Sequence, residues 1–418
     1  MKKHLKRIGA ITMISIFAFV FYATTNAVAA ERINLGLIYA LSGAGSSLGT
    51  KQMAAAKLAV KEINDRGGIK LHGKMVKINA ICKDTETKPD AAIRKMKGMI
   101  RRDKIAALVG GTFAHVSMAL NDQSKRTPVL LCWTNGVPEE VFLKKNKGPY
   151  SCSTMANVTA IGRGAAGYVT EVMKMKNIVA CMPDYAYGHG AYEGMEEVFK
   201  KYPDVKYKVI WTPVGTADMT AYLIKAREAN PDVIMMGQWG NDAINILKQA
   251  YDMKLRKNTK LFFNWIVDVF ATGIPPETLE GVICQMFWYH YMSGFPDPKV
   301  VAASNKINAD YMAAYGEPLD PYAMSAYCGV KEMIRAIELA QSTDSKKAYA
   351  ALMAHPDWVS GKGPAKWRKD GQVSYRNASF IGLGLGPKQR KNPKWDYVKI
   401  IDSYKGGSFM KPASALGW

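Results

Sequence analysis

The sequence predicts an α/β fold in which parallel β-sheets are covered by helices. Short apolar runs alternate along the chain with segments whose apolar residues recur at helical spacing, and this alternation is typical of parallel sheets with right-handed crossovers. The chain has 418 residues, of which 48% are hydrophobic and 22% charged. These values indicate a globular protein with two structural units rather than one.

The first unit of the pattern is a strand, a glycine-rich loop and a helix. The apolar run "INLGLIYA" (33–40) precedes the loop "LSGAGSSLGT" (41–50). The spacing of Met53, Ala56, Val60 and Ile63 predicts a helix from Thr50 to Arg66, which Gly67-Gly68 ends.

The same alternation continues through the middle of the chain. Further strands are expected at residues 74–82, 105–111, 127–133, 177–184, 205–211, 231–239 and 260–265, and helices at 89–102, 191–201 and 220–230. In such folds ligands bind beyond the carboxyl ends of the strands. We expect these ends at Ala40, Gly111, Trp133, Asp184, Trp239 and Trp265.

The glycine loop is not a nucleotide-binding motif. Gly43, Gly45 and Gly49 are spaced G-x-G-x-x-x-G, one residue longer than the dinucleotide fingerprint, and the order Gly49-Thr50-Lys51 does not match a P-loop. Two interpretations of the loop stay open. In the first, its hydroxyls and N–H groups, including those of Ser42, bind a polar or anionic group of a ligand. In the second, the loop is a plain strand-to-helix turn.

Residues 1–30 are expected to be a cleaved signal peptide. Four basic residues precede an apolar core from Ile8 to Tyr22, and the small residues Ala27-Val28-Ala29 follow it. An uncleaved membrane anchor is disfavoured because the apolar core is short. No cysteine follows the core, so we expect an exported, periplasmic protein that is not a lipoprotein.

The charge and the cysteines further limit the function classes. The net charge is +22, and residues 1–30 carry four of the positive charges and no negative one, which leaves +18. Because the lysines are spread over the whole chain, a solvated basic surface is favoured over a nucleic-acid partner. Six cysteines in an exported chain permit disulfides, and a Cys132–Cys152 bridge is expected; no CxxC pair or His/Cys cluster predicts a metal site.

The opening stretch "INLGLIYALSGAGSSLGTKQMAAAKLAVKEINDRGGI" resembles the start of the periplasmic solute-binding proteins of branched-chain amino acid ABC transporters. Four later stretches agree in order: "AALVGGTFAHVS", "TPVLLCWTNGVPEE", "CMPDYAYGHG" and "PDVIMMGQWGNDAINILKQA".

The resemblance implies a type I periplasmic-binding-protein fold with two Rossmann-like parallel-sheet lobes, which close about a three-strand hinge on the ligand. It implies no cofactor. We expect crossings of the chain near 152–154, 284–286 and 363–365. Lobe 1 then comprises residues 31–152 and 285–363, and lobe 2 comprises residues 153–284 and 364–418, the last part including a C-terminal extension.

The resemblance also implies which residues hold the ligand. The family's carboxylate-binding loop matches residues 112–117, with Ala114 where a serine is expected, and its next loop matches residues 133–136, with Gly136 where a threonine is expected. The acid that pairs with an amino acid's ammonium matches Trp265, and a one-turn shift would return an acid to the site as Asp268, three residues on. The expected ligand-binding set is Ser42, Leu48, Thr112, Phe113, Ala114, His115, Trp133, Thr134, Asn135, Gly136, Tyr187, Trp239, Trp265 and Asp268.

These matches predict a monomeric receptor that binds a small amino-acid-like, amide or aromatic or aliphatic carboxylate ligand and delivers it to an ABC permease. A periplasmic sensor that docks on a signalling receptor is the alternative. No G-x-S-x-G or H-E-x-x-H motif indicates an enzyme. Because the ammonium-pairing acid is replaced, we expect a ligand without an α-ammonium, such as an aromatic or aliphatic carboxylate or a neutral amide.

Overall fold

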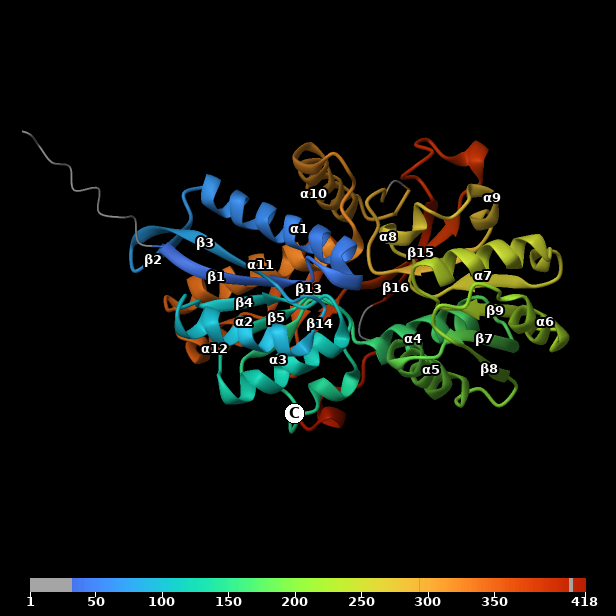
Figure 1. The fold of residues 1–418 in the computed structure, drawn as a ribbon, viewed down its shortest axis with the longest axis horizontal. Helices are drawn as coiled ribbons and strands as arrows, with labels where there is room; N and C mark the ends of the chain where they lie inside the picture. Colours follow the sequence, from blue (N-terminus) through green and yellow to red (C-terminus); the bar gives the residue numbers. More distant parts are fainter. Residues whose placement is uncertain (1–31, 293, 406–408) are drawn as a thin grey trace, which may run out of the picture. The chain divides into compact units, whose positions relative to one another are not determined.

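The computed structural model describes residues 32–292, 294–405 and 409–418. The expected signal peptide therefore lies outside the described residues. Residues 32–418 form one compact unit, which contains two large sheets (Figure 1). None of the helices within the described residues is long and apolar enough to cross a membrane.

The six-stranded sheet has the order β2-β3-β1-β4-β5-β6, and only β2 runs antiparallel to its neighbour. Its strands are β1 (Arg32–Tyr39), β2 (Ile69–Leu71), β3 (Lys74–Asp84), β4 (Ala107–Gly110), β5 (Leu130–Trp133) and β6 (Ser151–Ser153). One face packs against α1 (Ser46–Asp65), α11 (Pro321–Ala340) and α12 (Ser345–Ala354), and the other against α2 (Pro89–Arg101) and α3 (Ala114–Arg126). Ile38 faces α2 and α3, whereas its neighbours Leu37 and Tyr39 face α1 and α11, as the period of two in a strand requires.

The seven-stranded sheet has the order β16-β15-β11-β10-β9-β7-β8. Its parallel strands are β7 (Asn177–Pro183), β8 (Lys206–Thr212), β9 (Val233–Met236), β10 (Lys260–Phe263) and β11 (Ile283–Met286), and β15 (Asn377–Gly384) and β16 (Val398–Lys405) add antiparallel pairs. Its helices are α4 (Val158–Gly167), α5 (Ala186–Phe199), α6 (Thr220–Glu228) and α7 (Asn241–Asp252), and the short α8 (Asp268–Ala271) and α9 (Pro276–Leu279) follow β10.

The chain passes between the two sheets more than once. It leaves the first sheet after β6, and after β11 it returns through α10 (Pro298–Tyr315) to α11 and α12. A crossing was expected near 363–365, but β13 (Gly363–Trp367) and β14 (Val373–Tyr375) pair with β12 (Asp357–Ser360) in a small third sheet. The chain joins the seven-stranded sheet only at Asn377, because Trp367 is held beside α11 by an indole hydrogen bond to Glu332 (2.7 Å).

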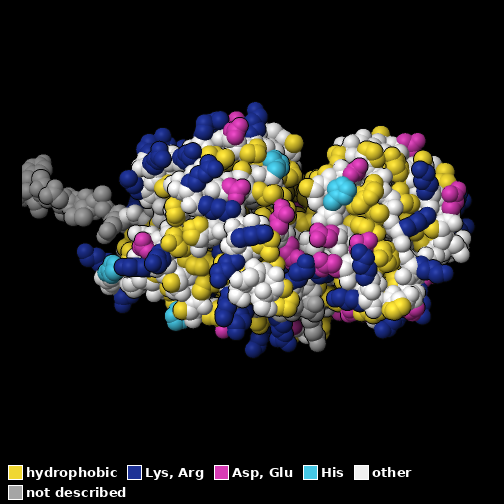
Figure 2. All heavy atoms as spheres, turned by 90° about the horizontal axis from the view of Figure 1, so that it is seen from below, with side chains coloured by type: hydrophobic (Ala, Val, Ile, Leu, Met, Phe, Trp, Pro, Cys, Tyr) yellow, Lys and Arg dark blue, Asp and Glu magenta, His cyan; other side chains and the backbone are white. Residues whose placement is uncertain are grey.

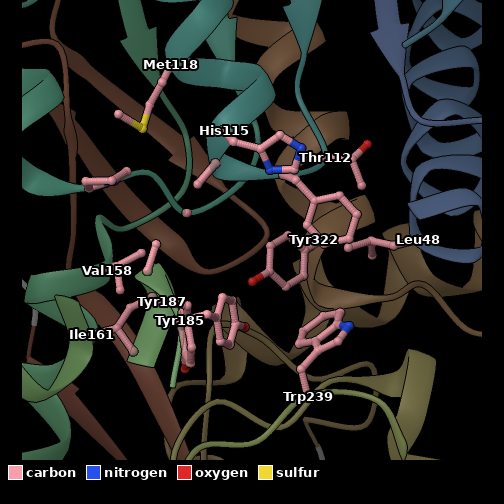
Figure 3. A pocket seen from close by; sticks show the side chains of 15 residues that line it. Leu48, Thr112, His115, Met118, Val158, Ile161, Tyr185, Tyr187, Trp239 and Tyr322 are labelled. Carbon is pink, nitrogen blue, oxygen red and sulfur yellow. The ribbon is translucent and has the colours of Figure 1, made fainter. Parts of the chain in front are cut away.

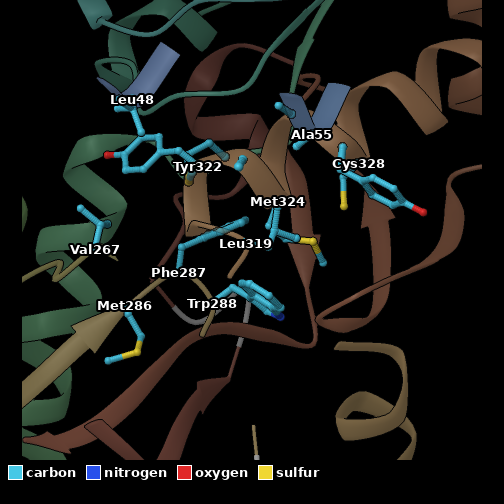
Figure 4. Packing of buried hydrophobic residues seen from close by; sticks show 14 of the residues in the cluster. Leu48, Ala55, Val267, Met286, Phe287, Trp288, Leu319, Tyr322, Met324 and Cys328 are labelled. Atoms are coloured by element: carbon cyan, nitrogen blue, oxygen red, sulfur yellow. The ribbon is translucent and has the colours of Figure 1, made fainter. Parts of the chain in front are cut away.

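A continuous apolar core joins the helices of the first sheet to the segment after β11. Leu48 of α1 and Tyr322 and Met324 of α11 belong to the same buried cluster as Phe287 and Trp288 (Figure 4). Each fully buried side chain of this size contributes roughly 1.5–3 kcal/mol of transfer free energy. The segment after β11, through which the chain returns to the first sheet, is therefore part of the hydrophobic core and not a linker.

The glycine loop is a tight turn into α1, which begins at Ser46 rather than at the expected Thr50. A Cβ atom on Gly49 would lie 1.9 Å from the carbonyl oxygen of Ala40, so glycine lets the helix approach the end of β1. The Ser42 hydroxyl donates to Asp84 (2.6 Å), and the Leu41 N–H donates to the same carboxylate (2.8 Å). The polar groups of the loop are thus already hydrogen-bonded to the Asp84 carboxylate. This favours the interpretation of the loop as a strand-to-helix turn.

The expected disulfide is not formed. All six cysteines lie within the described residues and carry free thiols. Cys132 and Cys152 are register partners on β5 and β6, but the Cys152 thiol donates to Leu131 O (3.4 Å) and the Cys132 thiol to Trp133 O (3.6 Å). Both thiols are fully buried and behave as small apolar side chains.

Lys147, a buried lysine beside this cysteine pair, makes the stability of the protein depend on pH. Burial lowers the pKa of Lys147 to about 8, against about 10.4 in an unfolded chain. Between these values the unfolded chain binds a proton that the folded protein lacks, so this lysine makes the free energy of unfolding rise with pH. Relative to Lys147→Met, the wild type should gain stability between about pH 8 and 10.4.

Chemical denaturation of both proteins across that range checks the prediction. The buried thiols act in the opposite direction, because unfolded cysteines lose protons above about pH 8.5, but both proteins contain them and the difference cancels their effect. A stability difference that stays constant from pH 7 to 10 would contradict the shifted lysine.

Candidate functional site

A cavity of about 180 Å³ lies where the carboxyl ends of both sheets meet (Figure 3). Its walls come from the loops and helices after β1, β4 and β5 on one side and after β6, β7 and β9 on the other, with one residue from α11. The lining residues are Leu48, Thr112, Phe113, Ala114, His115, Met118, Gly136, Pro138, Val158, Ile161, Tyr185, Ala186, Tyr187, Trp239 and Tyr322. None of these is acidic, and none is lysine or arginine.

Eight of the expected ligand-binding residues line this cavity. They are Leu48, Thr112, Phe113, Ala114, His115, Gly136, Tyr187 and Trp239. All of them follow the end of a parallel strand or stand in the first turns of the next helix, where this class of fold places its ligands.

The N-terminus of α3 forms one polar side of the cavity. The first N–H groups of a helix have no intrahelical acceptor, and the N-cap residue Phe113 provides no side-chain hydrogen bond to them. Thr112 accepts a hydrogen bond from Ala40 N (3.0 Å), and His115 lies 3.2 Å from Thr87 O through Nε2. These contacts hold the helix end in place and leave its N–H groups available to an anionic ligand group.

The N-terminus of α5 faces the cavity from the second sheet. Its N-cap, Tyr185, also provides no side-chain hydrogen bond, and Ala186 and Tyr187 of its first turn line the cavity. Two helices that belong to different sheets thus present uncapped N-termini to one space. Both carry a partial positive charge there.

Aromatic rings form the opposite wall. Trp239 packs edge-to-face on Phe270, with ring centroids 5.2 Å apart, and on Tyr322, at 6.1 Å. Burial raises the pKa of the Tyr187 and Tyr322 hydroxyls, so both stay protonated at neutral pH. In Figure 3, Trp239 and Tyr322 lie on the side opposite Met118, Val158 and Ile161. The wall suits a planar apolar group.

Four expected residues near the first sheet do not line the cavity. Trp133 is fully buried and packs edge-to-face on Phe142, because its position on β5 turns the ring toward the α3 side. Thr134 is fully buried and contacts Tyr39 and Gln52, and the Asn135 amide oxygen accepts from Ser117 (2.7 Å). Ser42 is held by Asp84, as described above.

Trp265 and Asp268 do not line the cavity either. Trp265 has a left-handed backbone (φ 72°) and packs on Phe287 at 6.1 Å. Asp268 is 3% exposed. Its carboxylate contacts His290 Nδ1 (3.1 Å) and accepts from the Tyr397 hydroxyl. A one-turn shift that would return this acid to the ligand is therefore not found.

The sequence interpretation missed seven lining residues. Tyr185 and Ala186 directly follow the expected strand end at Asp184. The apolar run that predicts this strand was therefore sufficient to identify them. Tyr322 comes instead from the start of α11, where the Asp320 N-cap and Pro321 mark a helix start. The others are Met118, Pro138, Val158 and Ile161, which no strand end indicates.

Comparisons with known proteins agree with this architecture. The chain is 22% identical over 336 residues, 79% of its length and 85% of the other, to a protein of Pseudomonas aeruginosa named amino acid binding protein. A branched-chain amino acid ABC transporter periplasmic ligand-binding protein from Burkholderia xenovorans superposes with a TM-score of 0.81 at 19% identity, over 92% of this chain and 98% of that one. A solute-binding protein of an ABC transporter from Rhodopseudomonas palustris, in complex with 3,4-dihydroxybenzoic acid, superposes with a TM-score of 0.74 at 18% identity, over 90% and 97%.

These structural likenesses confirm the expected type I fold of periplasmic binding proteins, with two lobes built on the two sheets. The family described as periplasmic binding protein matches residues 32–380. That match takes in both sheets as far as β15, and with it every residue that lines the cavity. The chain belongs to the periplasmic binding protein family.

Proposed function

We propose that the protein is the extracytoplasmic receptor of an ABC importer and that it captures a small organic acid without an α-ammonium group. The observation that carries the ligand class is the cavity wall, which offers two uncapped helix N-termini and aromatic rings but no acidic side chain among its lining residues. A carboxylate would accept hydrogen bonds from the N–H groups of α3, and an aromatic ring would lie against Trp239 and Tyr322.

A zwitterionic amino acid fits this wall poorly. Its ammonium would be buried without a carboxylate partner, which costs several kcal/mol. The Rhodopseudomonas relative, which is in complex with 3,4-dihydroxybenzoic acid, supports the aromatic carboxylate as the compound class to test first.

The wider setting of this receptor is part of the proposal. The basic and apolar N-terminal segment supports export by a cleaved signal peptide without a lipid anchor. We infer a monomer that binds without catalysis, closes its lobes on the ligand and delivers it to a membrane permease. Lobe 1 would comprise the six-stranded sheet with α1–α3 and α10–α12, and lobe 2 the seven-stranded sheet with α4–α9.

Calorimetry of the ligand-free mature protein tests the ligand class. Benzoate and 3,4-dihydroxybenzoate should bind at least about 100-fold more tightly than phenylalanine or leucine, because a penalty of ~3 kcal/mol corresponds to that ratio. Phenylpropionate matches phenylalanine without its ammonium and is the paired control. Equal or tighter binding of phenylalanine would contradict a cavity that lacks an ammonium site.

A further inference from the structure

Residues 409–418, here called the strap, connect the two sheets a further time. Phe409 and Met410 pack on Ala160 of α4 and Ala378 of β15, beside the seven-stranded sheet. Leu416 packs in the core between the six-stranded sheet and α3, and the Trp418 indole donates to Phe142 O (2.8 Å). Figure 1 accordingly marks the end of the chain near α3.

The middle of the strap joins a network of four charged side chains. Arg163 of α4 makes two hydrogen bonds to Glu139 (2.8 and 2.5 Å) and one to Glu197 of α5 (2.6 Å). Lys411 of the strap contacts Glu139 (3.1 Å) and Glu197 (2.9 Å), and Arg163 also donates to Phe409 O (3.0 Å). Glu139 follows β5 of the six-stranded sheet, so the network joins both sheets and the strap.

The network is balanced in charge, and its central Arg163–Glu139 pair is shielded from water. Two cations face two carboxylates, and the Arg163 and Glu139 side chains are only 5% and 9% exposed. Burial alone would lower the pKa of Arg163, but the hydrogen bonds that its guanidinium donates to Glu139 and Glu197 outweigh burial and raise that pKa. Removal of one partner would leave a buried charge unpaired, which is the costly way to break such a group. Figure 2 shows lysine and arginine side chains spread over one face of the molecule and several acidic side chains near its middle.

The network lies directly behind the cavity. Pro138, next to Glu139, and Ile161, two residues before Arg163, both line the cavity. The chain crosses between the sheets here, where Val158 N donates to Val137 O (3.1 Å). The Arg163–Glu139 contact thus fixes the separation of the two cavity walls at the crossing.

We propose that Arg163 and Glu139 are positioning residues for the cavity and that the strap clamps them through Lys411, so that the lobes open only at the edge far from this crossing. The role of the cavity rests on the proposed function, but the clamp itself is a property of the ligand-free protein. The strap therefore limits how widely the lobes separate.

Ligand-free mature protein with Lys411→Met or Glu139→Gln tests the clamp. The matched control is Glu196→Gln, which breaks an exposed pair with Lys200 (2.8 Å) at the C-terminal end of α5. In both test variants, amide hydrogen exchange of residues 136–143 and 158–164 should rise about tenfold and the radius of gyration from small-angle scattering should increase. The control should match the wild type in both measurements.

Lys411 is 37% exposed, so Lys411→Met should still fold. This variant therefore keeps the test interpretable if Glu139→Gln fails to fold. A lower melting temperature with unchanged radius and exchange would assign the network a merely structural role and overturn the proposal. Wild-type behaviour of both variants would overturn it as well. Because no ligand is added, neither outcome depends on which compound the cavity binds.

Discussion

Replacement of Trp239 by alanine is expected to weaken binding of the aromatic acid about 10- to 100-fold. The indole forms the aromatic wall with Tyr322 and Phe270, and loss of one such apolar contact costs roughly 1.5–3 kcal/mol. Calorimetry with 3,4-dihydroxybenzoate measures the change. The melting temperature should remain close to that of the wild type, because Trp239 is only half-buried.

Trp358→Ala is the matched control for this experiment. Trp358 is also half-buried, but it lies on β12 beside Trp367, outside the cavity lining. Its replacement should leave the affinity unchanged whatever it does to stability. If Trp239→Ala binds the acid as tightly as the wild type, the aromatic wall does not contact the ligand.

Replacement of Gly194 by alanine is expected to destabilise the protein by about 3 kcal/mol. A Cβ atom there would lie 2.0 Å from Thr159 O, and one on Gly162 would lie 1.8 Å from Ala191 O. The two glycines let α4 and α5 pack with their backbones in contact, and an added methyl group must push the helices apart. Urea denaturation measures the loss.

Gly98→Ala is the control for an added methyl group in a helix. Gly98 lies inside α2, where the nearest atom to a new Cβ is the end of the Arg102 side chain at 3.7 Å. This variant should gain roughly 0.5–1 kcal/mol, because alanine loses less backbone entropy in a helix than glycine. Similar effects of the two substitutions would show that α4 and α5 are not in close contact.

The first part of the fold was predictable because its signals are local. Each apolar run from residue 33 to 265 that was expected to be a strand contains one, and the expected helices at 89–102 and 220–230 differ from α2 and α6 by one or two residues. The later strands β15 and β16 were not predicted. They pair antiparallel on an edge that β11 provides, so their place depends on a strand distant in sequence.

The candidate site was predictable only to the level of strand ends. The sequence identifies where β5 ends. Which side each residue faces depends on the pleat of the strand, so that Trp133 lies in the core while Gly136, three residues later, lines the cavity. Trp265 illustrates the same limit, because its left-handed backbone redirects the ring, and no pattern of residue types encodes that conformation for tryptophan. Tyr322 is brought to the cavity by tertiary packing alone.

The six-stranded sheet is covered partly by α11 and α12, which come from a distant part of the chain. This arrangement determines when the protein can complete its fold. The sheet's strands end at residue 153, and α1 covers part of the face that carries Leu35, Leu37 and Tyr39, but the other two helices on this face, α11 and α12, begin only at residue 321. During synthesis this face is therefore only partly covered until more than three quarters of the chain has been made. Partly made chains of this kind expose apolar surface. If the protein is exported as proposed and its N-terminus crosses the membrane first, the six-stranded sheet can complete its core only after α11 and α12 have also crossed.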